Sequence, residues 1–280
     1  MDYSNAIEQG NDVAVFNIKN FSLDQTLDCG QCFRWQSTDE GYVGVVNGRQ
    51  LSVRMHNDNL ILKDMTMDEF HSTWKDYFDL NRDYSQIKDL YSSDTHLAKA
   101  ISFSPGLRVL RQDPWETLIT FILSQNSNIP RIKKMVLELC VNFGAVLPSG
   151  GHDFPTPCAL ASLTVQALAP VKAGYRAPYI IDAAKQVASG KICLTSLQNQ
   201  SSETIKKHLC HIHGVGPKVA ECALLFGFGR VEICPMDVWI KRVMNTLYPM
   251  GFPDVFLPTA GIAQQYLFHY ARNFPEELVK

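Results

Sequence analysis

Hydrophobic and polar positions alternate in short runs over the first quarter of the chain, a pattern typical of strands in an antiparallel sheet. Turn residues separate the runs at Asp39-Glu40-Gly41, Asn47-Gly48 and Asn57-Asp58-Asn59, and such residues favour tight hairpins. We therefore predict a sheet within residues 12–64, with strands at 13–18, 30–36, 42–48, 50–56 and 59–65.

After the sheet, apolar positions recur at helical spacing. Thr66 and Glu69 match a capping box, and Asp113 followed by Pro114 matches a capped helix with proline in its first turn. We predict a surface loop at 145–160 and helices at 67–80, 84–92, 95–103, 114–125, 130–144, 164–169, 175–189, 201–211, from 217, 238–248 and 261–273.

The change from alternation to helical spacing indicates two parts. We place the boundary near residues 104–112. The expected fold class is α+β, with an antiparallel sheet domain and its helices at 1–108 and an all-helical domain at 109–280.

Charge is divided unevenly between these parts. The whole chain has a net charge of −2, which argues mildly against a nucleic-acid partner. Residues 1–100 carry 9 Lys and Arg against 16 Asp and Glu, whereas residues 101–280 carry 17 against 12. The helical part is therefore basic, as contact with DNA would require.

The eight cysteines suggest reduced core thiols of a cytosolic protein, because most lie in apolar sequence. Cys29 and Cys32 form a lone C-x-x-C, and zinc would need further ligands at suitable spacing. The acidic N-terminus does not match a signal or transit peptide. No apolar run approaches about 18 residues, so we expect no membrane span.

The most informative segment runs from Leu209 to Asp237. Gly214 and Gly216 bracket Val215, and glycine reaches positive φ without steric cost. Pro217 suits the first position of a helix. The pattern predicts a helical hairpin whose backbone N–H groups, beside a positive helix end, could bind a phosphate.

Lys218 and Asp237 add chemistry to this hairpin. Lys218 lies in the first helical turn, where the dipole disfavours a cation and so favours the neutral amine that a nucleophile requires. Asp237 is placed to cap the next helix. The alternative is an ordinary hairpin with a surface lysine and a simple cap.

The segment LCHIHGVGPKVAEC, residues 209–222, together with Pro235-Met236-Asp237, resembles the helix–hairpin–helix and Gly/Pro-rich-Asp loop of the 8-oxoguanine DNA glycosylases in the HhH-GPD superfamily. The resemblance implies a TBP-like N-terminal sheet domain, then two helical lobes with the active site between them. It implies base-excision repair: removal of 8-oxoguanine from duplex DNA through a Schiff base on Lys218, aided by Asp237, followed by β-elimination as an AP lyase.

The same resemblance implies a base pocket. Gly30, in Asp28-Cys29-Gly30-Gln31, matches a glycine whose carbonyl accepts from N7–H of 8-oxoguanine, whereas N7 of guanine is itself an acceptor. Gln264 matches the glutamine that reads the Watson–Crick edge. Phe268, one helical turn later, and Cys222 would pack on the two faces of the base.

Further matches imply contacts with DNA. Asn126 would fill the gap left by the flipped base, and Arg131 would read the opposite cytosine. Tyr175 and Arg176 would form a wedge beside the estranged base. The alternatives are a cap or solvated charge for the first two, and a buried tyrosine with a surface arginine for the pair.

Two positions depart from the better-known relatives. Trp239 stands where they have a histidine that contacts phosphate, and Ala271 stands where they have the aspartate that supports it. Both partners are absent together. Lys241 or Arg242 could supply the phosphate contact instead.

The resemblance implies no required cofactor. Carbonyls of Cys210, Ile212 and Val215 could hold a structural monovalent or calcium ion in the hairpin, and no cysteine follows Cys234, so we expect no iron–sulfur cluster. The expected partner is duplex DNA with 8-oxoguanine opposite cytosine, bound by a monomer in the nucleoid of a prokaryote or the nucleus of a eukaryote.

Two other functions stay open from the sequence. The protein could be a glycosylase for a different lesion, although monofunctional relatives usually lack the lysine. It could also be a non-catalytic DNA-binding module, because helix–hairpin–helix elements often only grip phosphates.

Overall fold

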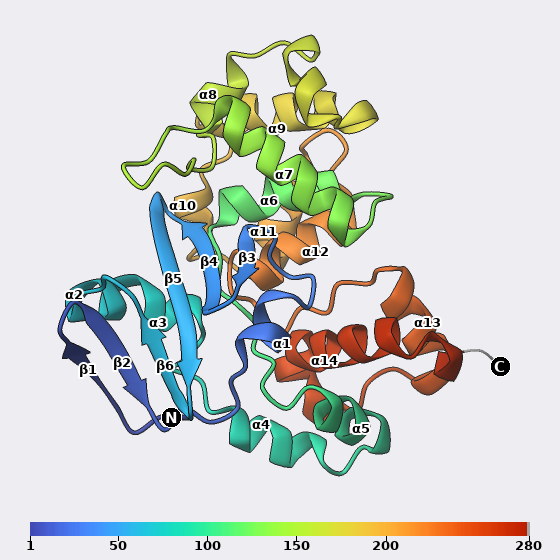
Figure 1. Ribbon diagram of the computed structural model, residues 1–280. Helices are drawn as coiled ribbons and strands as arrows, with labels where there is room; N and C mark the ends of the chain where they lie inside the picture. Colours follow the sequence, from blue (N-terminus) through green and yellow to red (C-terminus); the bar gives the residue numbers. More distant parts are fainter. Residues whose placement is uncertain (279–280) are drawn as a thin grey trace.

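The computed structural model describes residues 1–278 and contains one antiparallel sheet with strand order β1-β2-β6-β5-β4-β3 (Figure 1). The three predicted turns connect β3 to β4, β4 to β5, and β5 to β6. The strands are β1 Asn5–Gln9, β2 Asp12–Phe16, β3 Trp35–Thr38, β4 Gly41–Val46, β5 Arg49–His56 and β6 Asn59–Leu62.

Two parts of the strand prediction are wrong. The sequence carries no alternating signal for β1, because it is an edge strand whose residues are mostly exposed. Residues 30–34, predicted as strand, form an irregular turn after the short helix α1, Leu23–Leu27, which the pattern did not predict. Phe33 packs into the core of the helical part, and Arg34 pairs with Glu116 of that part, whereas Cys32 stays in the core of the sheet.

The helical prediction is largely confirmed. Thr66 and Glu69 form the capping box, and the predicted helix from residue 67 ends at Tyr77 and contains a π-helical turn. Elements absent from the prediction are α10, η4, η5 and, at the end of the predicted loop, α8. The helices are α2 Met67–Glu69, η1 Phe70–Trp74, α3 Lys75–Tyr77, α4 Tyr84–Tyr91, α5 Thr95–Phe103, α6 Pro114–Ser124, α7 Ile129–Phe143, α8 Pro157–Ala161, η2 Gln166–Val171, η3 Gly174–Arg176, α9 Ala177–Ala188, α10 Leu194–Leu197, α11 Ser202–Leu209, α12 Pro217–Phe226, α13 Val238–Leu247, η4 Asp254–Thr259, α14 Ala260–Asn273 and η5 Pro275–Leu278.

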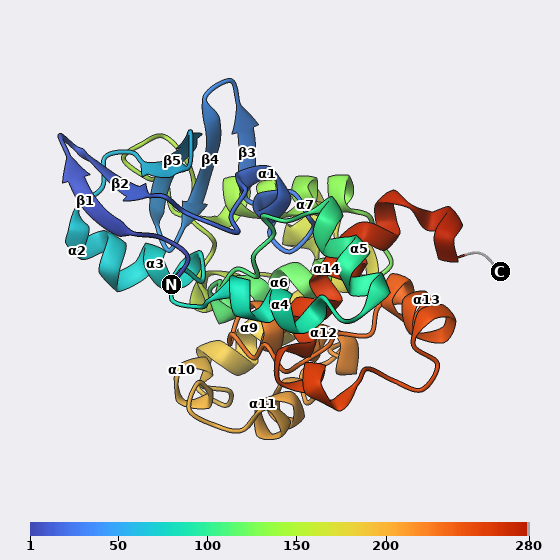
Figure 2. The same ribbon diagram turned by 90° about the horizontal axis from the view of Figure 1, so that it is seen from below.

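The side chains divide into two hydrophobic cores. One belongs to the sheet and α2–α3 and ends in sequence at Leu80, with Leu110 added. The other joins all the later helices, and it takes Cys29 and Phe33 from the sheet part. Helices α4 and α5 therefore pack with the helical part, α5 against α14 (Figure 2), although they precede our predicted boundary.

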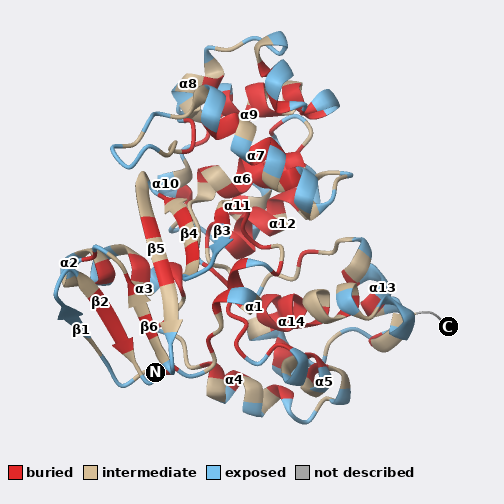
Figure 3. Cartoon of the chain, viewed as in Figure 1, coloured by how far each residue is buried: buried red, intermediate tan, exposed pale blue. Residues whose placement is uncertain are grey.

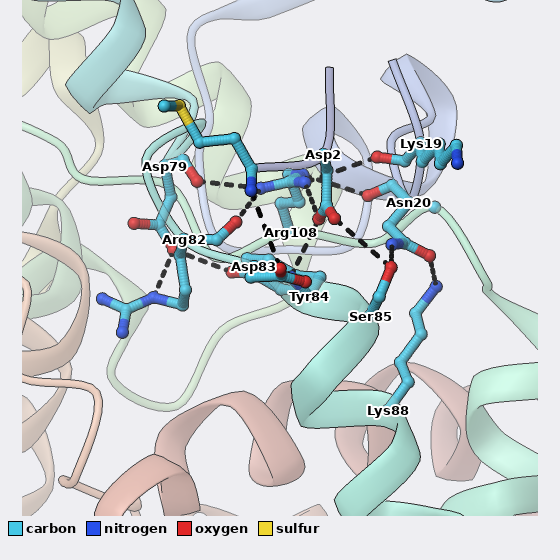
Figure 4. A network of polar contacts seen from close by, with 12 residues as sticks. Asp2, Lys19, Asn20, Asp79, Arg82, Asp83, Tyr84, Ser85, Lys88 and Arg108 are labelled. Carbon is cyan, nitrogen blue, oxygen red and sulfur yellow. Dashed lines mark hydrogen bonds and ion pairs between the residues drawn. The ribbon is translucent and has the colours of Figure 1, made fainter. Parts of the chain in front are cut away.

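A buried arginine connects the sheet part to the helical part. Arg108 is fully buried, pairs with Asp2, and donates to the carbonyls of Asn20 at 3.0 Å and Asp79 at 2.8 Å (Figure 4). Its guanidinium also lies 4.3 Å from the ring centre of Tyr84. Because an unpaired buried charge is costly, this network fixes the N-terminus against the start of the helical part.

Burial is densest in three helices of the second core. Nearly every residue of α6 and α12 is buried, as is the first half of α14 (Figure 3). All eight cysteines are free thiols. Four are buried and Cys234 packs against the second core, as expected of core thiols, whereas Cys158, Cys193 and Cys210 are exposed. Among the described residues, no helix is both long and apolar enough to cross a membrane.

Candidate active site

A cavity of about 330 Å³ opens between the turn at Gly30, in the sheet part, and the helices of the second core. This volume is in the range of small-molecule pockets. Its walls come from the turn at Gly30, α6, α7, α12, the loop before α13, and α14. The lining residues are Gly30, Phe33, Phe121, Ser124, Ser127, Asn128, Ile129, Pro130, Ile132, Lys218, Cys222, Phe226, Pro235, Asp237, Trp239, Gln264, Gln265, Phe268 and Arg272.

The predicted hairpin is confirmed between α11 and α12, and Pro217 is the first residue of α12. Gly214 has φ +80°, and a Cβ there would lie 2.2 Å from the ring of Tyr179, so no other residue fits. Gly216 differs from the expectation, because its φ of −92° is open to any residue. It is the N-cap of α12, and no atom lies within 4 Å of the place that a Cβ would take there.

Lys218 enters the cavity from the first turn of α12. Its Nζ lies 3.4 Å from Ser124 Oγ and 5.3 Å from the ring centre of Phe121. It forms no ion pair with a carboxylate of another described residue within 4 Å. The amine is therefore held only weakly and is half-buried beside apolar side chains.

Asp237 faces the same cavity and caps α13, as predicted. Its Oδ1 accepts a hydrogen bond from Ile240 N at 2.8 Å. Burial raises the pKa of this carboxyl above its usual value, and the cap hydrogen bond and the nearby Lys218 oppose that rise. The cavity thus brings together an amine and a desolvated carboxylate that are separated by 19 positions.

Residues of α14 also line the cavity. Gln264 is 4% exposed, and its Oε1 has no hydrogen-bond partner among the described residues. Phe268 lies one turn further along the same helix. On α12, burial raises the pKa of the Cys222 thiol to about 11, so this side chain is neutral and presents a soft apolar surface.

Gly30, which the family resemblance assigns to the base pocket, also lines the cavity. Its φ is +90°, and a Cβ would lie 2.6 Å from Ile129 Cδ1 and 3.4 Å from Arg272 Nη1. Both the backbone conformation and the space therefore require glycine. Its carbonyl accepts no hydrogen bond from any residue in the described part of the chain.

The residues expected to contact DNA gather around the end of α6. Asn126 is exposed with φ +47°, and Arg131 is exposed in the first turn of α7. Tyr175 is 52% exposed, and its hydroxyl donates to the carbonyl of Gln125 at 3.2 Å. Gln125 Nε2 in turn donates to the Gly214 carbonyl at 3.1 Å, which links this turn to the hairpin.

Arg176 does not form an exposed wedge with Tyr175. It is 2% exposed, and its guanidinium donates to the carbonyls of Gln125 at 2.7 Å, Asn126 at 3.0 Å and Ala173 at 3.1 Å. The expected surface role is corrected for this structure, because the guanidinium satisfies three carbonyls beneath the Asn126 turn. Lys241 lies on the exposed face of α13.

Several residues of the cavity had no role in the predictions from sequence. Arg272 lies 5.4 Å from the ring centre of Phe268. Trp239, noted only as a departure, lines the cavity with Arg242 5.3 Å from its ring centre. Gln265 is 1% exposed and faces the Gly30 turn. Two adjacent glutamines in an otherwise apolar helix were the available signal for it.

The fold and this site indicate the class of protein to which the chain belongs. Residues 119–253 match the family model of the HhH-GPD superfamily base excision DNA repair proteins. Residues 13–118 match that of the 8-oxoguanine DNA glycosylase N-terminal domain. The chain is thus a base-excision DNA glycosylase of the helix–hairpin–helix superfamily.

Individual relatives narrow the class. The chain is 33% identical to the N-glycosylase/DNA lyase of Saccharomyces cerevisiae over 85% of this chain and 71% of the relative. It is 27% identical to a probable N-glycosylase/DNA lyase of Methanothermobacter thermautotrophicus over 91% and 95%. The solved 8-oxoguanine glycosylase/lyase of Clostridium acetobutylicum, in complex with DNA containing cytosine opposite 8-oxoguanine, superposes with a TM-score of 0.92, at 35% identity, over 98% of this chain and 100% of that one. This protein belongs to the 8-oxoguanine DNA glycosylase/lyase family, and it is a DNA glycosylase with AP lyase activity.

Proposed function

We propose that this protein excises 8-oxoguanine opposite cytosine with Lys218 as the nucleophile and Asp237 as its electrostatic partner. The observation that carries the proposal is one cavity lined by the amine of Lys218 and the carboxylate of Asp237 together with Gly30, Gln264 and Phe268. Such a cavity can hold a flipped purine between its reading groups and its reacting groups.

The first step exchanges one bond at the sugar. The neutral amine of Lys218 attacks C1′, and the bond from C1′ to N9 breaks with its electron pair leaving on the base. The departing base takes up a proton. The negative charge of Asp237 stabilises the cationic character that develops at C1′, and its burial strengthens that interaction.

The second step nicks the strand. The adduct nitrogen then loses its remaining proton, and its lone pair forms an imine between Lys218 Nζ and C1′ as the bond from C1′ to O4′ breaks. O4′ leaves with the electron pair of that bond and takes up a proton, so the sugar ring opens. Removal of a proton from C2′ then allows the 3′ phosphate to leave with its electron pair. No cofactor takes part in either step.

The reading groups distinguish the lesion from guanine by hydrogen-bond polarity. The free carbonyl of Gly30 suits the N7–H donor of 8-oxoguanine and repels the N7 acceptor of guanine. The unsatisfied Oε1 of Gln264 suits a donor on the Watson–Crick edge. Phe268 and Cys222 flank the space between them and would cover the two faces of the base.

Exposed groups near the cavity suit the rest of the duplex. Asn126 and Tyr175 lie where the DNA duplex would be opened by the flipped nucleotide. Arg131 is exposed and can reach the cytosine opposite the lesion. Gly214 and Gly216 N–H groups form no hydrogen bond to another described residue and suit a phosphate, as does Lys241. Monomeric action on chromosomal DNA, in a nucleoid or nucleus, fits this single contiguous site.

A structural cation in the hairpin is a further part of the proposal. The carbonyl of Ile212 already accepts from Val215 N at 3.0 Å, whereas the carbonyls of Cys210 and Val215 accept no hydrogen bond from another described residue. Their free lone pairs fit a monovalent or calcium ion, which prefers oxygen ligands. Such an ion would rigidify the phosphate-binding loop and would not touch the reacting atoms.

The test is borohydride trapping on duplexes with 8-oxoguanine opposite each of the four bases. Wild type should form a covalent complex most readily opposite cytosine, because reduction of the imine fixes Lys218 to the sugar. Lys218→Gln should abolish trapping and reduce strand cleavage by at least about a thousandfold.

Lys191→Gln makes the same substitution at an exposed residue of another loop and should leave trapping unchanged. Trapping that persists in Lys218→Gln would remove this lysine from the role of nucleophile. Duplexes carrying an alkylated purine or an oxidised pyrimidine complete the panel, and preferred excision of either would assign the protein a different lesion.

A further inference from the structure

Helix α14 carries two consecutive buried glutamines that face different partners. Gln264 lines the cavity, and its buried Oε1 accepts no hydrogen bond from another described residue. Gln265 donates from Nε2 to Cys29 Sγ at 3.2 Å and to the Cys29 carbonyl at 3.5 Å. Cys29 immediately precedes Gly30, so adjacent residues of one helix contact the base site and the turn that carries the Gly30 carbonyl.

The turn around Gly30 is also held by hydrogen bonds to residues outside α14. The thiol of Cys29 donates to the Thr26 carbonyl at 3.3 Å. Gln31 Nε2 donates to the Arg108 carbonyl at 2.7 Å, and Gln31 Oε1 accepts from Leu110 N at 2.8 Å. These bonds fix Cys29 and Gln31 relative to the segment around residue 108, which Tyr266 of α14 contacts in turn through its hydroxyl, 2.9 Å from the Leu107 carbonyl.

Gln265 joins α14 to the turn directly. Its two contacts cross 236 positions of sequence and are fully buried. Within the described chain, it is the residue of α14 that hydrogen-bonds to the turn. Asp28 is also paired with Lys133 of α7 at 2.6 Å, but that lysine lies on a different helix and the aspartate is exposed.

We propose that Gln265 is a positioning residue for base specificity, which sets the Gly30 carbonyl at a fixed distance from the Gln264 amide. The inference rests on the proposed function, because it concerns the reading of 8-oxoguanine. A purine is rigid, so its N7 side and its Watson–Crick edge can be read together only when the two reading groups keep a fixed separation. A small displacement of the carbonyl weakens the one contact that distinguishes the lesion from guanine.

The AP lyase reaction separates this role from a general structural one. An abasic site offers no base, so β-elimination needs Lys218 and Asp237 but neither Gly30 nor Gln264. A residue that positions the reading groups should affect base excision and leave cleavage of an abasic site unchanged. A residue needed for the fold should affect both reactions to the same extent.

The experiment compares single-turnover excision of 8-oxoguanine with cleavage of an abasic duplex for wild type and Gln265→Met. Methionine keeps the length of the side chain and removes its donor. We expect excision to fall about three- to tenfold, the usual value of a lost hydrogen bond, and abasic cleavage to stay within about twofold. Release of undamaged guanine, measured relative to 8-oxoguanine, should rise.

A matched control makes the same change away from the cavity. Gln198 Nε2 donates to the carbonyl of Phe228 at 3.3 Å, so Gln198→Met also removes one amide donor from one carbonyl. Both of its activities should equal those of wild type. Cys29→Ser keeps an acceptor for Gln265 and should retain most excision, whereas Cys29→Ala should shift the ratio of the two activities in the same direction as Gln265→Met.

The outcomes are distinct. Equal loss of excision and abasic cleavage in Gln265→Met, or no change in their ratio, overturns the positioning role. If that variant does not fold, the ratio measured for Cys29→Ala decides in the same way. Wild type that cleaves abasic DNA but releases no 8-oxoguanine would instead refute the proposed function.

Discussion

The wall of the cavity that carries Lys218 and the wall that carries Gly30 differ in how firmly their polar groups are held. Lys218 Nζ has one long contact, 3.4 Å from Ser124 Oγ, and an aromatic ring nearby. The neighbours of Gly30, in contrast, make hydrogen bonds to Thr26, Arg108, Leu110 and Gln265, all in buried positions.

This difference follows from what each wall must do. A nucleophile changes partners during the reaction, from protein to sugar, so strong contacts in the free enzyme would have to be broken first. A group that reads a base has the same partner geometry before and after binding, so rigidity strengthens its discrimination. The comparison predicts that changes on the first wall reduce all chemistry, whereas changes on the second alter base choice.

The largest effect in this comparison is expected from Asp237→Asn. Loss of a charge that stabilises the transition state should reduce both excision and abasic cleavage about a hundred- to a thousandfold. Asparagine caps helices as well as aspartate, so α13 should be retained. Single-turnover rates on the two substrates measure the effect, and a loss confined to one substrate would contradict the assignment of Asp237 to the reacting wall.

The ionisation of Asp237 should make both stability and activity depend on pH. Burial raises the folded-state pKa of Asp237, so the ionised form costs stability, and that cost appears as pH rises through the raised value. Wild-type activity should fall as pH drops through the same value, while the rate of Asp237→Asn should not show this step. Thermal unfolding at neutral pH should show Asp237→Asn to be at least as stable as wild type.

A smaller and more selective effect is expected from Gly30→Ala. The added Cβ would meet Ile129 Cδ1 at 2.6 Å, and φ of +90° is strained for alanine, so the turn must shift. Excision of 8-oxoguanine should fall about ten- to a hundredfold, and abasic cleavage should change little.

The control is an alanine at a glycine that also has positive φ but has free space around its Cβ position. Gly174 has positive φ but nothing within 4 Å of its Cβ position, so Gly174→Ala tests the strain alone. If Gly174→Ala reduced excision as much as Gly30→Ala, strain rather than the position of the carbonyl would explain the effect.

The contrast between the walls also explains what the sequence could predict. Lys218, Asp237, Gln264 and Phe268 lie in or beside helices at fixed spacing, so local pattern together with the family resemblance located them. Their function depends on which face of a helix they occupy, and periodicity determines that face.

The rest depends on contacts between distant segments. Arg176 is buried because it satisfies carbonyls of Gln125 and Asn126, 50 positions earlier, and no local pattern contains that information. The division of the cores near Leu80 and the partner of Gln265 have the same origin. At Gly216 the local pattern predicted too much. The Gly-Val-Gly sequence suggested positive φ at both glycines, but in the hairpin only Gly214 has it.

The smallest expected effect concerns the segment just after the Gly30 turn, on the cavity wall that carries Gly30. Arg34 follows Phe33, which lines the cavity, and its guanidinium lies 3.0 Å from Glu116 of α6. Burial raises the pKa of Glu116 to about 7, against the influence of Arg34. Since the folded-state pKa lies above the unfolded value, the contribution of Glu116 to stability is complete below about pH 4.5 and is lost as pH rises through 7.

Glu116→Gln tests this link between the sheet domain and α6. The free energy of unfolding of wild type relative to the variant should decrease by about 1–3 kcal/mol between pH 5 and pH 8, as measured by urea denaturation at each pH. Abasic cleavage should be unaffected, because Glu116 does not line the cavity with Lys218. A stability difference that increases with pH would mean that the ionised Arg34–Glu116 pair stabilises the fold. The cavity wall that carries Gly30 would then be held in place by this ion pair rather than by its buried amide hydrogen bonds.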